Sequence, residues 1–160
     1  MVSIAFLEVD TWEIPLLKKA LPRDNLVFFK GNLSSNVLRK MRNVQIVSPF
    51  IYDRMDKKAI DKLPKLKYIS TRSTGYDHID IKECKKRKIK VSNVPFYGEN
   101  TVAEHTFALL LLISRNLFLA IERSKRGDLS RTGLQGFDLR GKTIGIIGGG
   151  HIGLHVARMA

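Results

Sequence analysis

The chain contains 160 residues, of which 44% are hydrophobic and 27% are charged. This is the composition of a globular protein with a buried core, and it excludes a disordered tail, a collagen-like chain and a disulfide scaffold. The longest apolar run, residues 107–113, is far shorter than the roughly 20 residues that span a bilayer, and the N-terminus lacks the basic start of a secretory signal. The only cysteine, Cys84, cannot form an internal disulfide. We therefore expect no membrane partner and a reducing, cytoplasmic location.

Charge is the unusual feature of the composition, because 28 Lys and Arg against 15 Asp and Glu give a net charge of +13. The densest basic stretch, residues 82–90, has no interleaved aromatic residues and no nucleic-acid-binding motif. We expect a solvated helix end here and no nucleic-acid partner. A basic patch that binds nucleic acid is the alternative, and binding that weakens steeply with added salt would identify it.

Short apolar runs alternate with segments of helical periodicity through the first hundred residues. The pattern predicts strands over residues 3–9, 26–29, 44–47, 68–71 and 89–92. It predicts intervening helices over residues 12–21, 34–41, 53–63 and 79–87. Five strands separated by helices favour parallel βαβ units, so the expected fold is α/β with a doubly wound parallel sheet.

Two loops follow strands of this sheet at their carboxyl ends, where open α/β sheets bind ligands. In the first, residues 72–78, Gly75 permits a backbone conformation that directs several N–H groups toward one point, as in an anion-binding nest. The second loop covers residues 93–98. Spacing alone favours a plain turn over a nest in the first loop.

One long helix is expected over residues 101–126. Thr101 and Glu104 have the spacing of a capping box, which would fix the start of the helix. Apolar residues within 107–121 cover most of its faces, so it should be buried against more than one neighbour. On its own the chain should expose this apolar surface and self-associate.

A glycine-rich motif follows a further apolar segment, residues 142–147, which is predicted to be a strand. The motif is G-x-G-x-x-G, formed by Gly148, Gly150 and Gly153, and a helix begins within it. Gly148 would make a tight turn, Gly150 would let the backbone approach a diphosphate, and Gly153 would let helix and strand pack closely. The helix N-terminus would direct N–H groups and its positive dipole toward the phosphates.

Three segments in order, residues 70–80, 91–105 and 141–148, resemble the N-terminal half of the D-isomer-specific 2-hydroxyacid dehydrogenases. Within that family the D-lactate dehydrogenases are the most similar. The resemblance implies a flavodoxin-like substrate domain over residues 1–98. It implies that residues 99–160 are the opening helix and first βα unit of a Rossmann NAD-binding domain. For the full-length form it implies a homodimer.

The resemblance also implies which residues bind. The backbone N–H groups of Ser73, Thr74, Gly75 and Tyr76 would hold the substrate carboxylate, and Tyr97 would line the active site. The implied NAD-binding residues are Thr101, Gly148, Gly150, His151, Ile152 and Gly153. His151 departs from the Arg or Lys that is commoner in the family, which would weaken a phosphate contact without changing its backbone part.

The implied chemistry is reversible hydride transfer between NADH and a small 2-oxo acid such as pyruvate, giving D-lactate. The family uses an Arg to orient the carboxylate and a His–Glu pair to move the proton, and all three lie beyond residue 160. We therefore expect neither a catalytic residue nor a metal site in this chain. A missing acid–base pair removes a rate factor of roughly 10² to 10⁴, so the chain alone should be inactive.

A non-catalytic truncated module with a binding or regulatory role is the alternative to this enzyme function. The choice between NAD and NADP and the identity of the 2-oxo acid stay open.

Overall fold

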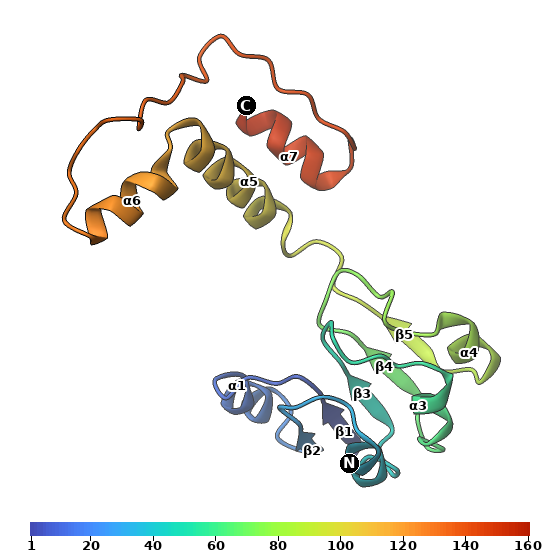
Figure 1. Cartoon of the computed structure of the whole chain (residues 1–160). Helices are drawn as coiled ribbons and strands as arrows, with labels where there is room; N and C mark the ends of the chain where they lie inside the picture. The colour runs from blue at the N-terminus through green and yellow to red at the C-terminus, as the bar shows by residue number, and fades with distance from the viewer. The chain divides into compact units, whose positions relative to one another are not determined.

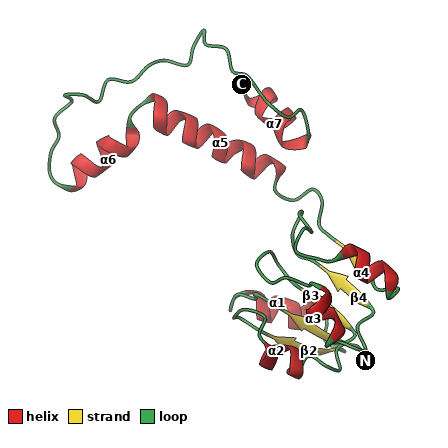
Figure 2. Cartoon of the chain, turned by 45° about the vertical axis from the view of Figure 1, so that its right-hand side comes forward, coloured by secondary structure: helices red, strands yellow, loops and turns green.

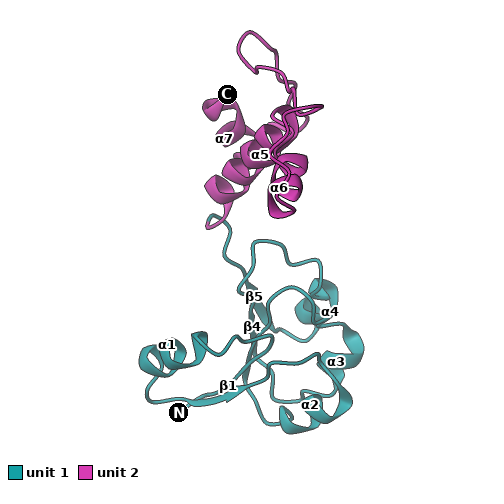
Figure 3. Ribbon diagram, turned by 60° about the vertical axis from the view of Figure 1, so that its left-hand side comes forward, with its two compact units in different colours: residues 1–96 teal, residues 97–160 magenta.

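A computed structural model describes all 160 residues of the chain (Figure 1). The chain divides into two compact units, Met1–Phe96 and Tyr97–Ala160, coloured teal and magenta in Figure 3. The division falls close to the domain boundary expected after residue 98. We call the two parts unit 1 and unit 2.

Unit 1 contains a five-stranded sheet in which every neighbouring pair of strands is parallel. The strands are β1 (Ser3–Phe6), β2 (Asn25–Phe28), β3 (Ile46–Ser48), β4 (Tyr68–Ser70) and β5 (Lys90–Ser92). Their order across the sheet, β2-β1-β3-β4-β5, is the flavodoxin-like order. The expected α/β fold with a doubly wound parallel sheet is therefore confirmed.

Helices cover both faces of this sheet (Figure 3). The four helices are α1 (Glu13–Ala20), α2 (Ser35–Lys40), α3 (Lys57–Asp61) and α4 (Ile81–Lys86). Along β1 the side chains alternate between the faces: Ala5 packs in the larger core with α2, α3 and α4, whereas Ile4 and Phe6 pack in the smaller core with α1. One strand thus contributes to both cores.

Local capping explains where the short helices of unit 1 begin. Side-chain oxygens of Ser34, Asp56 and Asp80 each accept a hydrogen bond from a backbone N–H three residues later. The helix expected over residues 53–63 is shorter than predicted, because Asp56 caps it and the residues before Asp56 turn around another side chain, Glu8. The strand expected over residues 3–9 also ends early, since Glu8 adopts a left-handed conformation with φ of 53°.

Unit 2 contains three helices, α5 (Glu99–Ser114), α6 (Leu117–Lys125) and α7 (His151–Met159). The prediction of a single helix over residues 101–126 is wrong, because Asn116 has a φ of 49° and separates α5 from α6. A distant loop makes this break favourable: Phe137 N donates to Ser114 O at 2.9 Å, and Asn116 Nδ2 donates to Gln135 O at 2.9 Å.

Two further local predictions in unit 2 are wrong. Helix α5 begins at Glu99 with no side-chain cap, so Thr101 lies inside the first turn and forms no capping box with Glu104. Residues 142–147 form no strand, and residues 126–150 contain neither helix nor strand (Figure 2). A strand requires a neighbour for its hydrogen-bond ladder, and unit 2 contains no other strand.

Apolar side chains of α5 and α6 are exposed, as expected for residues 107–121. The exposed set in this region is Leu109, Leu111, Ile113, Leu117, Phe118, Leu119 and Ile121. No single helix is long and apolar enough to cross a membrane, and α5 and α6 reach that length and composition only as a pair bent by 70°.

Candidate functional site

The candidate substrate loop, residues 73–76, follows β4 at the carboxyl edge of the sheet in unit 1. Hydroxyl groups fix it from one side: Thr71 Oγ1 and Ser73 Oγ lie 2.6 Å apart, and each contacts Phe50 O at 3.0 Å. Ser73 Oγ also contacts Gly75 O at 2.7 Å. Buried Thr71 and Ser73 therefore anchor the loop to the segment that follows β3.

The segment after β5 holds the same loop from the other side. Val94 N donates to Ser73 O at 3.0 Å, and Thr74 Oγ1 donates to Val94 O at 3.0 Å. Asn93 Nδ2 donates to Thr74 O at 2.8 Å. These contacts use the carbonyl groups and hydroxyls of residues 73–76, whereas their four backbone N–H groups donate no hydrogen bond within the chain.

A second row of backbone N–H groups lies at the same edge of the sheet, and it is filled by a carboxylate of the chain itself. The N–H groups of Phe50 and Asp53 donate to Glu8 Oε1 at 3.3 and 2.9 Å. Those of Ile51 and Tyr52 donate to Glu8 Oε2 at 3.0 and 2.9 Å. Burial raises the pKa of the Glu8 carboxyl, but the four donors outweigh burial and hold this pKa below its ordinary value.

Asp53 and His78 are two further titratable groups at this edge whose pKa values are shifted. Burial raises the pKa of Asp53, and although Leu33 N donates to its Oδ1, its buried Oδ2 has no hydrogen-bond partner. Burial also lowers the pKa of His78, whose Nε2 lies 3.2 Å from Thr71 Oγ1. His78 is thus a neutral component of the loop's hydrogen-bond network near pH 7.

An open pocket of about 460 Å³ lies beside the candidate substrate loop. It is lined by Ile51, Tyr52, Arg54, Gly75, Asp77 and His78. Its volume suits a small ligand, but a pocket of about 430 Å³ also lies between α2 and α3, so volume alone does not identify a site.

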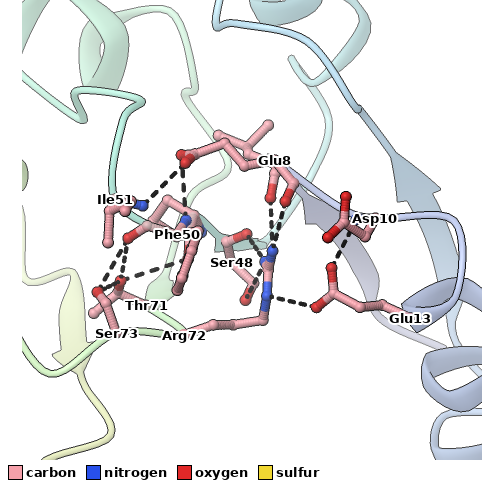
Figure 4. A network of polar contacts seen from close by, with 11 residues as sticks. Glu8, Asp10, Glu13, Ser48, Phe50, Ile51, Thr71, Arg72 and Ser73 are labelled. Atoms are coloured by element: carbon pink, nitrogen blue, oxygen red, sulfur yellow. Dashed lines mark hydrogen bonds and ion pairs between the residues drawn. The ribbon is translucent and has the colours of Figure 1, made fainter. Parts of the chain in front are cut away.

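Arg72 lies at the base of the loop and connects three strands (Figure 4). Its guanidinium donates to Ser48 O at the end of β3 and to Leu7 O directly after β1, and its Nε lies 3.5 Å from Glu13 Oε1. Burial lowers the pKa of Arg72, and Glu13 and Glu8 oppose this shift, so the guanidinium stays charged at neutral pH. Sequence analysis assigned no role to Arg72, Glu8 or Glu13.

The glycine-rich loop belongs to unit 2 and leads directly into α7. Gly148 has a φ of +104°, which suits the tight turn expected there. A Cβ on Gly153 would lie 2.0 Å from Gly148 O, so only glycine fits. A Cβ on Gly150, the N-cap residue of α7, would meet nothing within 4 Å, which leaves space for a ligand to approach its backbone. These features fit a diphosphate.

The remaining predicted cofactor residues lie around the start of α7. His151 Nδ1 and His155 Nε2 lie 3.3 and 3.8 Å from the Glu99 carboxylate, which brings the first turn of α5, containing Thr101, to the start of α7. The side chains of His151 and Ile152 are exposed.

The predicted substrate residues are divided between the two units. Exposed Tyr97 is the first residue of unit 2, whereas unit 1 contains Ser73, Thr74, Gly75 and Tyr76. No group of three or more His, Cys, Asp or Glu residues is placed to hold a metal ion.

Comparison with known proteins gives consistent matches over most of the chain. Residues 4–147 match the family model described as D-isomer specific 2-hydroxyacid dehydrogenase, catalytic domain. A 2-hydroxyacid dehydrogenase homolog of Haemophilus influenzae is 34% identical, with 84% of this chain and 41% of that protein covered. Glyoxylate reductase of Thermococcus litoralis is 35% identical, with 97% and 45% covered.

The solved structures include D-lactate dehydrogenase of Aquifex aeolicus complexed with NAD and lactic acid. It superimposes with a TM-score of 0.88 at 34% identity, with 98% of this chain and 47% of that chain covered. The chain thus spans about half the length of the relatives that it matches.

Proposed function

The chain belongs to the family of D-isomer-specific 2-hydroxyacid dehydrogenases, and from this premise we propose that it is the N-terminal part of an NAD-dependent member. The proposed reaction is reversible hydride transfer between NADH and a small 2-oxo acid, with pyruvate and D-lactate as the substrate pair. Residues 1–98 would be the substrate domain, and residues 99–160 the start of the cofactor domain.

One observation carries the substrate part of this proposal. Two rows of four backbone N–H groups lie at one edge of the sheet, and the row at residues 50–53 binds the Glu8 carboxylate. The row at residues 73–76 has no acceptor within the chain. Backbone N–H groups that converge on one point bind anions, so the four without an internal acceptor would suit the carboxylate of a 2-oxo acid. Tyr97 would complete the substrate side of the site.

The cofactor part rests on the glycine-rich loop and α7. The open space at Gly150 and the helix N-terminus that follows suit the diphosphate of NAD. Thr101, His151 and Ile152 would add contacts beside Gly148 and Gly153. When bound, NAD supplies or accepts the hydride, and this chain's residues hold and orient it.

The comparisons support two chemically similar candidate substrates. Glyoxylate reductases and D-lactate dehydrogenases occur among the relatives at similar identity, so glyoxylate is the competitor of pyruvate in this proposal. We further propose a homodimer for the full-length form and a cytoplasmic location, which suits the single, buried and unbridged Cys84.

Catalysis itself would depend on residues outside this chain. In this proposal the orienting Arg and the His–Glu pair of the family would lie outside residues 1–160, and His78 is bound to Thr71. His151 and His155 are held by Glu99. The isolated chain is therefore expected to bind ligands without turnover, because no positioned acid–base pair is available.

Titration of the ¹⁵N-labelled chain tests both binding roles. Pyruvate and glyoxylate should shift the amide signals of residues 73–76, and acetone, which lacks the carboxylate, should not. NAD should shift the signals of residues 148–153. Gly150→Val should abolish the NAD response, whereas Gly145→Val, at a position equally free of neighbours, should keep it. Shifts confined to other residues, or an unchanged NAD response in Gly150→Val, would overturn the assignments.

A further inference from the structure

We propose that Arg72 is a positioning residue for the 2-oxo acid, because its guanidinium holds the start of loop 73–76 against the ends of two other strands. The inference rests on the proposed carboxylate-binding function of that loop. Arg72 itself would not touch the substrate.

The hydrogen bonds of Arg72 explain how one side chain can set the position of the loop (Figure 4). Nη1 donates to Ser48 O, the last carbonyl of β3, at 2.7 Å. Nη2 donates to Leu7 O at 2.9 Å and to Glu8 O at 3.3 Å, directly after β1. The backbone N–H of Arg72 also donates to Pro49 O at 3.0 Å. A planar fork is thus connected to two neighbouring strands, which restricts both the place and the orientation of the residue before the loop.

The surroundings of the guanidinium keep it charged and fixed. Glu13 on α1 supplies a carboxylate at 3.5 Å from Nε, and both side chains are about one-fifth exposed. The rings of Phe6 and Phe50 each have their centroid 6.0 Å from the guanidinium carbon. Removing Arg72 would leave Glu13 and three strand-end carbonyls without this donor, which is costly where water is limited.

The loop needs such support because its own N–H groups are not used internally. Residues 73–76 are held only through carbonyls and hydroxyls. Phe50 O, the acceptor for the hydroxyls of Thr71 and Ser73, belongs to the segment that the Glu8 carboxylate organises. Arg72 and Glu8 therefore both fix the side of the loop that faces the segment after β3. A carboxylate site that is set before binding avoids the ordering cost of forming it on binding.

Arg87 offers a matched control within the same unit. It also donates to a backbone carbonyl, Ile60 O at 2.7 Å, and pairs with a carboxylate, Asp61 at 3.6 Å. It follows α4 and precedes β5, so the parallel topology puts it at the opposite, amino edge of the sheet. A purely stabilising role for Arg72 predicts that Arg72→Met and Arg87→Met affect the protein in the same way.

The test is titration of the ¹⁵N-labelled 160-residue chain with oxamate, an isostere of pyruvate, read from the amide signals of residues 73–76. Arg72→Met should raise the Kd for oxamate by about tenfold or more, because small displacements at a binding loop have large effects. Arg72→Lys should recover little of this loss, since an ammonium cannot form the fork. Arg87→Met should keep the Kd within about twofold of the parent even where urea denaturation shows it destabilised. An unchanged Kd in Arg72→Met would overturn the proposal.

Two further measurements keep the result decisive. If Arg72→Met does not fold, Glu13→Gln removes only the ion pair and should still weaken oxamate binding, and an unchanged Kd there would contradict the proposal. If the parent chain binds no oxamate, the proposed carboxylate binding by the loop is rejected, and the positioning role of Arg72 is then decided by another measurement. Hydrogen exchange then decides the positioning role: the amide of residue 72, which donates to Pro49 O, and that of Val94, which donates to Ser73 O, should exchange faster in Arg72→Met than in Arg87→Met, and equal rates would overturn it.

Discussion

Unit 1 buries the apolar side chains of its helices and strands, whereas unit 2 leaves most of its own exposed. The buried apolar residues of unit 2 are Ala103 and Val156 alone. The two units do not differ in the quality of their apolar patterns, since α5 is more apolar along its length than any helix of unit 1. They differ in partners: unit 1 has a complete sheet between its helices, and unit 2 has none. Burial therefore follows from the neighbours available to an element.

The same substitution in both units should show the largest difference. Ile60 on α3 is 0% exposed and Ile113 on α5 is 67% exposed. Ile60→Ala should cost about 2–5 kcal/mol of unfolding free energy, because it leaves a cavity in a packed core. Ile113→Ala should change it by less than about 0.5 kcal/mol. Urea denaturation followed by circular dichroism measures both, and equal costs would contradict the difference in packing.

Neutralising a carboxylate should likewise cost more stability in unit 1 than in unit 2. Glu8→Gln replaces an acceptor of four N–H groups by a group with one acceptor, and should cost about 2–3 kcal/mol at pH 7. Glu122→Gln on α6 removes only ion pairs with Lys125 and Arg126, and should cost less than about 0.5 kcal/mol.

Acid should reveal the origin of the Glu8 effect. The pKa of Glu8 is lower in the folded chain than in the unfolded one, so its stabilisation is complete above the ordinary pKa of a glutamate. It is lost as the pH falls through the lowered pKa. The stability difference between the parent and Glu8→Gln should therefore narrow in acid, and a difference that is constant from pH 7 to pH 3 would contradict this origin.

Removing the charge of Asp53 should change the stability in the opposite direction from Glu8→Gln, and by a smaller amount. The pKa of Asp53 is raised by burial, so its ionised form is unfavourable above that raised pKa, and the penalty disappears below the ordinary aspartate pKa. Asp53→Asn keeps an acceptor for Leu33 N and removes the charge, so it should stabilise the chain by about 1 kcal/mol at pH 7. The gain should vanish in acid. Destabilisation at pH 7 would be the contrary result, and exposed Asp61→Asn serves as the control that should bring no gain.

The smallest effect on stability is expected at the exposed face of unit 2, where association should change instead. Phe118 and Trp12 are both 67% exposed, but Phe118 lies among the exposed apolar residues of α5 and α6. Phe118→Ser should change stability by less than about 0.5 kcal/mol and reduce self-association in light scattering. Trp12→Ser should leave association unchanged, and an equal decrease in both variants would remove the special role of this face.

The sequence was sufficient for features that depend on neighbouring residues. Apolar runs located the five strands, and the glycine spacing located the turn at Gly148 and the start of α7. It was insufficient where distant partners decide. The break at Asn116 depends on Gln135, and the missing strand at residues 142–147 depends on a neighbour that unit 2 does not contain.

The network around the candidate substrate loop was missed for the same reason. Arg72 bonds to carbonyls that are 64 and 65 residues away, and no local pattern reports such a pair. One signal was present: Glu8 and Arg72 are charged residues that lie two positions beyond the ends of β1 and β4, at the edge of the sheet where ligands bind. A charged residue at such a position is a useful indicator of a hydrogen-bond network that supports a ligand-binding loop.

The most direct test of the proposed function is NADH oxidation by the full-length protein, of which this chain is proposed to be the N-terminal part, purified from its native source and measured with pyruvate and with glyoxylate. The account predicts oxidation of NADH with one or both acids and, with pyruvate, a product of the D configuration. If the protein binds NADH but oxidises none with any small 2-oxo acid, the dehydrogenase assignment is contradicted.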